Sequence, residues 1–194
     1  MRLSGSPPAK VGPNGPATLT HMNDSSIRID VPTLLSFMRA TAAEQGVPDA
    51  VTATEDDLLK TLDLPEPKVD TSPAQMNPSR NGKALILVTP EGEIAGMAIY
   101  FATYVAWIAK SGICLEDLFV LPPFRRRGYA RLLVQAVAKE AASLGCARME
   151  WLCYRENHRA LRFYRNIGAK ELDTLTFLRL DQEAMLKFSN EDPV

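Results

Sequence analysis

Two adjacent acidic residues, Glu116 and Asp117, stand in an apolar stretch, and three arginines, residues 125–127, follow shortly after them. A carboxylate in such a setting can accept a proton or hold a cation. The arginines lead into Gly128, after which apolar residues recur at helical spacing. A helix that begins there would direct unpaired backbone N–H groups and a partial positive charge at an anion. Residues 115–130 therefore predict a proton acceptor close to a phosphate-binding turn.

The composition excludes several classes of protein. The chain has 194 residues, 46% of them hydrophobic, with a formal net charge of −1 and a pI near 6.2. This charge gives no reason to expect nucleic acid or a membrane surface as the main partner. No run of about 18 apolar residues exists, so we expect no membrane-spanning segment. Three cysteines and two histidines, without zinc-site spacing, predict no disulfide framework, no bound metal and a reducing, cytoplasmic location.

The acidic pair and the arginine turn belong to a strand, helix, strand pattern. Residues 114–121 predict a strand, residues 130–144 predict a helix that ends at Gly145, and residues 147–153 predict a second strand. Short connections of this kind join parallel strands through a right-handed crossover. We therefore expect the acidic pair to lie in a sheet that contains a parallel pair of strands.

Further elements flank this pattern. The spacing predicts a hairpin over 84–88 and 93–104, helices over 31–46, 54–62, 158–167 and 181–188, and a strand over 175–180. Four prolines mark residues 63–82 as a loop. Residues 1–26 are rich in proline and glycine and predict a disordered leader, which leaves one domain over 27–190.

The arginine turn has a plain alternative, since a solvated surface turn could carry the same residues. Its surroundings favour function, and together they resemble the Gcn5-related N-acetyltransferase (GNAT) superfamily, within it the spermidine/spermine (diamine) acetyltransferase branch, over about residues 27–188. The blocks that carry the resemblance are Ile27-Arg28, residues 54–58 (TEDDL), Tyr100-Phe101, Thr103-Tyr104, Trp107-Ile108, residues 115–120 (LEDLFV), the arginine turn, Asn157 with Ala160 and Tyr164, and Gly168-Ala169.

The resemblance implies an α/β fold with a mixed central β-sheet, splayed parallel strands and flanking helices. Acetyl-CoA would lie between the splayed strands, with no metal. Its pantetheine arm would pair with the backbone of Leu118, Phe119 and Val120. Its pyrophosphate would lie on the turn formed by Arg125, Arg126, Arg127, Gly128, Tyr129 and Ala130, and Asn157 would approach it from the neighbouring strand. The resemblance also implies a homodimer.

Acetyl transfer to an amine requires two proton transfers. An alkylammonium has a pKa of about 10, so a base must remove a proton before the amine attacks the thioester. Glu116, through a water, is the candidate base; the alternative is an exposed strand carboxylate without a role. Tyr164 matches the family position that protonates the leaving thiolate; the alternative is a core tyrosine.

The acceptor is expected to be a primary amine of a small molecule, polyamine-like or diamine-like. Asp117 could hold its cationic end or form a surface salt bridge, while Tyr104 and Trp107 could line the acceptor slot or simply pack. Alternative acceptors are amino acids, thialysine-like amines and protein amines, and a catalytically inactive CoA-binding regulatory domain is a further alternative. Two departures bear on this: Arg126 replaces a glycine of the turn, and residues 154–156 differ from the diamine branch.

Overall fold

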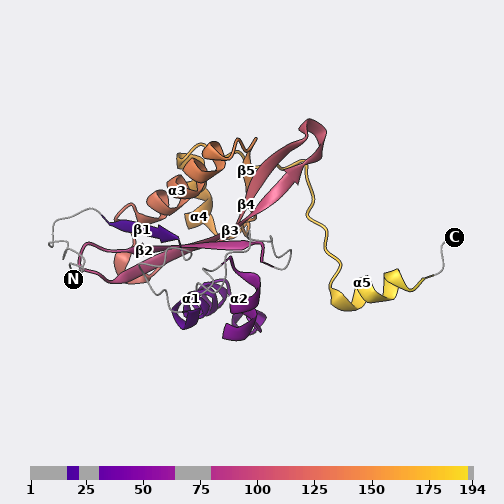
Figure 1. The fold of residues 1–194 in the computed structure, drawn as a ribbon, viewed down its shortest axis with the longest axis horizontal. Coiled ribbons are helices and arrows are strands. Elements are labelled where there is room, and N and C mark those ends of the chain that lie inside the picture. Colours follow the sequence, from indigo (N-terminus) through magenta and orange to yellow (C-terminus); the bar gives the residue numbers. More distant parts are fainter. Residues whose placement is uncertain (1–16, 22–30, 64–79, 192–194) are drawn as a thin grey trace, which may run out of the picture. The chain divides into compact units, whose positions relative to one another are not determined.

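The computed structural model describes residues 17–21, 31–63 and 80–191 (Figure 1). The chain divides into two compact units, Met1–Leu152 and Cys153–Val194, where one domain over 27–190 was predicted. The division falls just after β5, the last strand that pairs with the sheet. Within the described residues, no helix is long and apolar enough to cross a membrane.

The first unit is built on a mixed sheet. Its described strands pair in the order β1-β2-β3-β4-β5, antiparallel from β1 to β4 and parallel between β4 and β5. This confirms the predicted mixed sheet and the predicted parallel pair. The strands are β1 (Thr18–His21), β2 (Gly82–Val88), β3 (Ile94–Val105), β4 (Lys110–Val120) and β5 (Met149–Glu150).

Helices cover both faces of this sheet. Helices α1 (Val31–Glu44) and α2 (Glu55–Thr61) lie on one face, and α3 (Tyr129–Ser143) lies on the other (Figure 1). The core beneath α1 includes Leu34, Phe37, Ile86, Met97 and Phe119, all buried. Short 3-10 helices η1 (Pro48–Ala50), η2 (Ala106–Ile108) and η3 (Pro122–Phe124) join the elements. The helices thus pack on both faces of the sheet that leads to the arginine turn.

Several local predictions are confirmed. The hairpin forms as β2 and β3, and the helix after the arginine turn begins at Tyr129. At the start of α2, Thr54 accepts from the Asp57 N–H while the Asp57 carboxylate accepts from the Thr54 N–H, which completes a capping box. All three predictions rested on residues close together in the chain.

The predicted disordered leader is wrong over residues 18–21. These residues form β1, which pairs antiparallel with β2 from Thr18 to His21. A short edge strand gains its hydrogen bonds from the partner strand, and the partner here is more than 60 residues away in the chain, so local composition does not reveal it. Three other parts of the sequence prediction lie outside the described residues: leader residues 1–16 and 22–26, the block Ile27-Arg28, and most of the predicted loop over 63–82.

The second unit contains α4 (His158–Asn166) and α5 (Gln182–Ser189). Their bounds agree within one residue with the predicted helices over 158–167 and 181–188. The predicted strand over 175–180 is wrong: these residues form no ladder with any strand of the described chain. Their large apolar side chains are exposed, Phe177 at 61% and Leu178 at 84%. A strand requires a partner for its backbone hydrogen bonds, and an apolar run does not supply one.

Candidate active site

The edge of β4 is open along its second half. Strand β5 pairs with β4 only at Ile113 and Cys114, so the predicted strand over 147–153 is reduced to two residues. From Leu115 to Val120, β3 is the only strand that pairs with β4 in the described part of the chain. An edge of this kind presents backbone N–H and C=O groups that an extended ligand can bind as an added strand. The structure therefore places Leu118, Phe119 and Val120 on an open edge beside the parallel pair.

A β-bulge lies at Glu116. Tyr100 of β3 is opposite Leu115 and the preceding residue, Ile99, is opposite Asp117, so Glu116 is an extra residue in β4. A bulge bends its strand and redirects a side chain, and bulges occur often beside active sites. The Glu116 side chain is exposed. The bulge thus separates the paired part of β4 from the open part and places a carboxylate at the junction.

Asp117 lies on the α1 face of the sheet. It is partly buried opposite Ile99, a residue that packs against the core beneath α1. Burial raises the pKa of the Asp117 carboxyl to about 6, while hydrogen bonds from the Leu118 backbone and the Thr41 side chain of α1 oppose the rise. A carboxylate with this pKa is ionised at neutral pH and can hold a cation at the sheet's α1 face.

The backbone of the arginine turn is left-handed at two positions. Arg126 and Gly128 both have left-handed backbones, with φ of 64° and 83°. The backbone N–H groups of residues 126–130 donate to no acceptor found in the described part of the chain, and Gly128 begins α3 without a side-chain cap. A β-carbon at Gly128 would meet no heavy atom within 4 Å. Alternating backbone of this kind forms a concavity of N–H groups that suits a phosphate, so these residues fit the pyrophosphate of acetyl-CoA.

The three arginines of the turn differ in their surroundings. Arg125 contacts the end of β4 and α1, whereas Arg126 and Arg127 are exposed. The Arg127 guanidinium lies 5.5 Å from the Phe124 ring. Tyr129 and Ala130, the first residues of α3, are partly buried. Arg126 and Arg127 are therefore placed to add charge to the turn.

The second unit carries the other two predicted residues, Asn157 and Tyr164. Asn157 precedes α4, and its side-chain oxygen accepts from the Ala160 N–H at 3.1 Å, so it caps the helix. Tyr164 is partly buried on α4, with its ring 5.3 Å from that of Phe163. Sequence reasoning predicted this helix but not the capping role of Asn157, although an asparagine directly before a helical run is a recognised cap signal.

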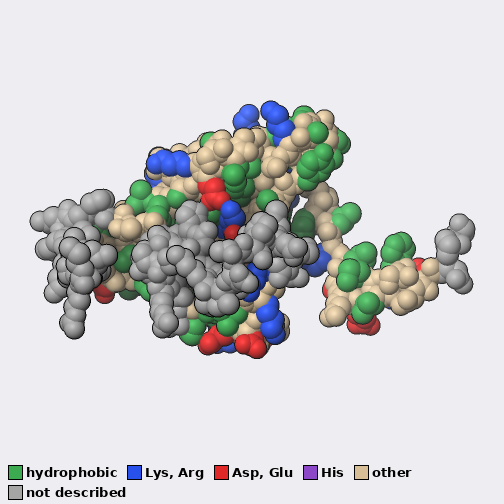
Figure 2. Space-filling view, in the orientation of Figure 1, with side chains coloured by type: hydrophobic (Ala, Val, Ile, Leu, Met, Phe, Trp, Pro, Cys, Tyr) green, Lys and Arg blue, Asp and Glu red, His purple; other side chains and the backbone are tan. Residues whose placement is uncertain are grey.

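Tyr104 and Trp107 lie at the far end of the β3–β4 hairpin. Trp107 is 99% exposed and Tyr104 is 70% exposed. Figure 2 shows hydrophobic side chains at this projecting end. Tyr104 pairs with Ser111, which stands five residues before Glu116, roughly 17 Å along a strand. The structure therefore does not bring these aromatic residues to the Glu116 of the same chain.

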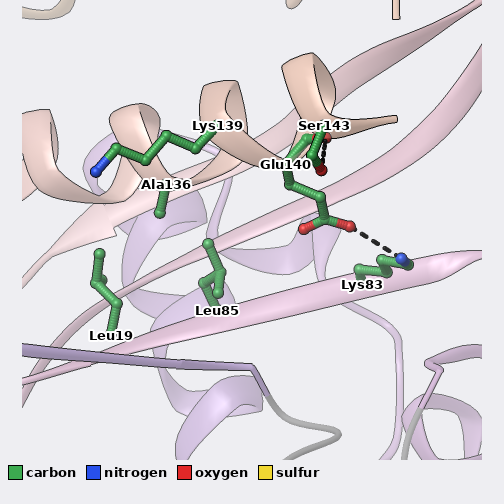
Figure 3. Close-up of a pocket in the computed structure, with 7 residues that line it drawn as sticks. All are labelled: Leu19, Lys83, Leu85, Ala136, Lys139, Glu140 and Ser143. Atoms are coloured by element: carbon green, nitrogen blue, oxygen red, sulfur yellow. Dashed lines mark hydrogen bonds and ion pairs between the residues drawn. The ribbon is translucent and has the colours of Figure 1, made fainter. Parts of the chain in front are cut away.

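A separate hollow of about 580 Å³ lies between α3 and strands β1 and β2, at the opposite edge of the sheet. Figure 3 shows Glu140 reaching from α3 to Lys83 of β2, whose Nζ donates to the carboxylate at 2.9 Å. Tyr100 also donates to Glu140, and burial raises the pKa of its hydroxyl. These contacts join α3 to the sheet, and they pair Glu140 with Lys83 and Tyr100. Among the described residues, no cluster of His, Cys, Asp and Glu could hold a metal ion.

The fold is shared with solved structures, one of which is named as an acetyltransferase. An integron cassette protein from the mobile metagenome of V. cholerae superposes with a TM-score of 0.65 at 19% identity, covering 92% of this chain and all of the other. An aminoglycoside acetyltransferase from an uncultured soil metagenomic sample superposes with a TM-score of 0.64 at 17% identity, over 85% of this chain and 97% of the other. At this identity the likeness shows a GNAT-type α/β fold and no more.

Family membership follows from the sequence match. Residues 52–169 match the Acetyltransferase (GNAT) family, which is more than half of the chain. The chain belongs to this family, and the resemblance inferred from the motifs is confirmed. The match includes the bulged strand, the arginine turn, Asn157 and Tyr164.

Curated relatives act on amines. The chain is 38% identical over 92 residues to an L-ornithine N5-acetyltransferase of Arabidopsis thaliana, covering 47% of this chain and 40% of that protein. It is 34% identical over 103 residues to a thialysine N-epsilon-acetyltransferase of Caenorhabditis elegans, covering 51% and 63%. A human spermidine/spermine N(1)-acetyltransferase-like protein is 25% identical over 167 residues, covering 84% of this chain and 23% of that protein. The chain thus spans only part of the length of these relatives.

Proposed function

We propose that this protein transfers an acetyl group from acetyl-CoA to a primary amine of a small aliphatic molecule. The observation that carries the proposal is the continuity of two backbone features: the open edge of β4 over 115–120 leads directly into a turn whose N–H groups at 126–130 are unpaired within the described part of the chain. The open edge suits an amide-bearing pantetheine arm, and the turn suits a pyrophosphate. The inactive regulatory domain is the competing candidate, and it would share both features.

The proposed reaction is a direct attack within a ternary complex. A water at Glu116 takes one proton from the acceptor ammonium and passes it to the carboxylate. The neutral nitrogen attacks the thioester carbonyl, the C–S bond breaks, and the Tyr164 hydroxyl gives its proton to the departing thiolate. The nitrogen then gives its second proton to the Tyr164 phenolate, which restores the hydroxyl, and Glu116 releases its proton to solvent. Burial raises the pKa of the Cys114 thiol, which disfavours a thiolate nucleophile and a covalent enzyme intermediate.

The acceptor is proposed to carry a second charged or polar group besides the reacting amine. The named substrates of the relatives, ornithine, thialysine and spermidine or spermine, share an aliphatic amine with such a second group. Asp117, on the α1 face, would hold a cationic end of the acceptor and orient the other amine toward Glu116. A homodimer and a cytoplasmic location stay predictions.

The test combines a binding and a turnover measurement. Calorimetric titration with acetyl-CoA is followed by a free-thiol release assay with spermidine, putrescine, L-ornithine, thialysine and an amino sugar as acceptors. The proposal expects micromolar-range binding and turnover with at least one aliphatic amine. Tyr164→Phe should keep acetyl-CoA affinity and lose turnover. Absence of acetyl-CoA binding would overturn the proposal, and binding without turnover on any amine would favour the regulatory domain.

A further inference from the structure

We infer that Arg125, the first arginine of the turn, is a positioning residue that joins the acetyl-CoA turn to helix α1, and that it is not a phosphate ligand. The inference rests on the proposed function, since it concerns how the turn is held for that ligand. It also replaces our prediction that the Arg125 side chain belongs to the pyrophosphate site. Its consequence is that the two substrates would be coupled through one side chain.

Arg125 contacts three residues of the described chain, Val120, Glu44 and Phe119. Its Nε donates to the Val120 carbonyl at 2.7 Å, and its guanidinium carbon lies 5.5 Å from the centre of the Phe119 ring. Another nitrogen of the guanidinium pairs with the carboxylate of Glu44, the last residue of α1. The side chain is only 23% exposed. The guanidinium of Arg125 therefore contacts both the end of β4 and the end of α1.

Helix α1 meets β4 along one face. Phe37 packs with its ring 5.6 Å from that of Phe119, Thr41 interacts with Asp117, and Glu44 pairs with Arg125. These three helix residues are four and three positions apart, which places them on a single face of α1. A shift of the turn that moved Arg125 would thus displace the face of α1 that contacts Asp117, the residue proposed to hold the acceptor.

The other two arginines of the turn provide the contrast. Arg126 and Arg127 are exposed and form no close ion pair with the described residues, although hydrogen bonds and the charge of Arg127 together lower the pKa of Glu91. Each can reach a ligand without breaking a protein ion pair. Arg125, in contrast, already uses two of its guanidinium nitrogens on the Val120 carbonyl and Glu44. The two roles therefore predict opposite effects of changing Glu44.

Coenzyme A titrations of the full chain separate the roles. If Arg125 positions the turn, Arg125→Gln and Glu44→Gln should each weaken CoA binding by about fivefold, and the double variant should be no weaker than either. If Arg125 binds phosphate, Glu44→Gln should leave CoA affinity unchanged or increase it, which would overturn the inference. Arg127→Gln is the matched control, and its effect should add to that of Glu44→Gln because the two do not touch.

A second readout distinguishes coupling from general damage. With an amine that the wild type uses, such as L-ornithine or spermidine, both single variants should raise the KM for the amine and leave kcat within about twofold. An unchanged amine KM would overturn the coupling. Arg125→Lys, which keeps the charge, should restore part of the affinity if the glutamine variant folds poorly. If the wild type binds no CoA, the proposed function fails. Thermal unfolding of the two single variants and the double variant at Arg125 and Glu44 still tests whether these residues interact. Stability losses that simply add would refute the interaction.

Discussion

The two halves of β4 share one strand and one neighbour, β3, yet they differ in what their backbone and side chains are free to do. The first half leads from the hairpin end to Ile113 and Cys114, where β5 pairs with it, and it carries no carboxylate. The second half, from the bulge at Glu116 to Val120, has an open edge, two carboxylates and the arginine turn beyond it. The candidate site residues of β4 thus lie where its pairing with β5 stops.

This difference shows that the unpaired edge of a sheet can serve as a binding site. A paired strand commits its backbone groups to its neighbours, whereas an open edge keeps them for an extended ligand. The bulge contributes a second effect, because it bends β4 at the point where the two halves meet. We therefore expect substitutions in the second half of β4 to affect acetyl-CoA binding or turnover, and substitutions at the hairpin end to affect neither.

The largest effect is expected at Glu116. Glu116→Gln removes the proposed base and should lower kcat/KM for the amine by roughly 100-fold or more, with acetyl-CoA affinity unchanged. Glu150→Gln, at a carboxylate on β5 that pairs with Arg148 at 2.8 Å, is the matched control and should leave turnover nearly intact. Steady-state kinetics across the pH range from about 6 to about 9 provides the measurement. Full activity of the Glu116→Gln variant would remove Glu116 as the base.

A smaller effect is expected at the turn. Gly128→Ala strains a left-handed backbone and places a methyl group in the open space where the pyrophosphate is proposed to lie, so acetyl-CoA binding should weaken by about tenfold or more. Gly145→Ala, at the other end of α3, suffers the same strain in equally open space. Both should lose about 1 kcal/mol of unfolding free energy. Equal acetyl-CoA affinities by calorimetry would show that the turn does not hold the ligand.

The next effect concerns the buried carboxyl at Asp117. Its folded-state pKa of about 6 lies above its ordinary value of 3.8, so ionisation costs stability that is intact below about pH 4 and fully lost above about pH 6. Asp117→Asn should therefore gain stability relative to wild type as pH rises through this window, by about 1–2 kcal/mol. Urea unfolding of both proteins at several pH values across the window measures it. Parallel pH profiles would contradict the assignment.

The smallest effect is expected at the hairpin end. Trp107→Ala removes a side chain that is 99% exposed, so the free energy of unfolding should change by no more than about 0.5 kcal/mol. Acetyl-CoA affinity should also be unchanged. A marked rise in the amine KM would show that Trp107 reaches an acceptor site, which within one chain the hairpin geometry does not provide.

Much of the fold could be predicted because it depends on local chemistry. Helical spacing located α3, the Thr54 cap located α2, and two apolar runs separated by a turn located the β2–β3 hairpin. The order of motifs indicated the family. Elements that depend on a distant partner were missed or misplaced: β1 needs β2, β5 keeps only two of seven predicted residues, and the segment over 175–180 has no ladder among the described strands.

The candidate site could be predicted only in part for the same reason. Residue types and spacing identified Glu116, Asp117 and the turn, but the bulge at Glu116 exists only in the register with Ile99 and Tyr100 of β3. The positive φ of Arg126 follows from its place in a glycine-like turn. The direction of Arg125 depends on Glu44, which lies 81 positions away in the sequence. Spacing along a chain does not contain these cross-element contacts.

Amide hydrogen exchange with and without acetyl-CoA compares both halves of β4 in one experiment. We expect acetyl-CoA to slow exchange at the outward-facing amides of residues 118–120 and at residues 126–130, and to leave residues 104–112 unchanged. Protection confined to the hairpin end, or binding without protection of the turn, would contradict this expectation.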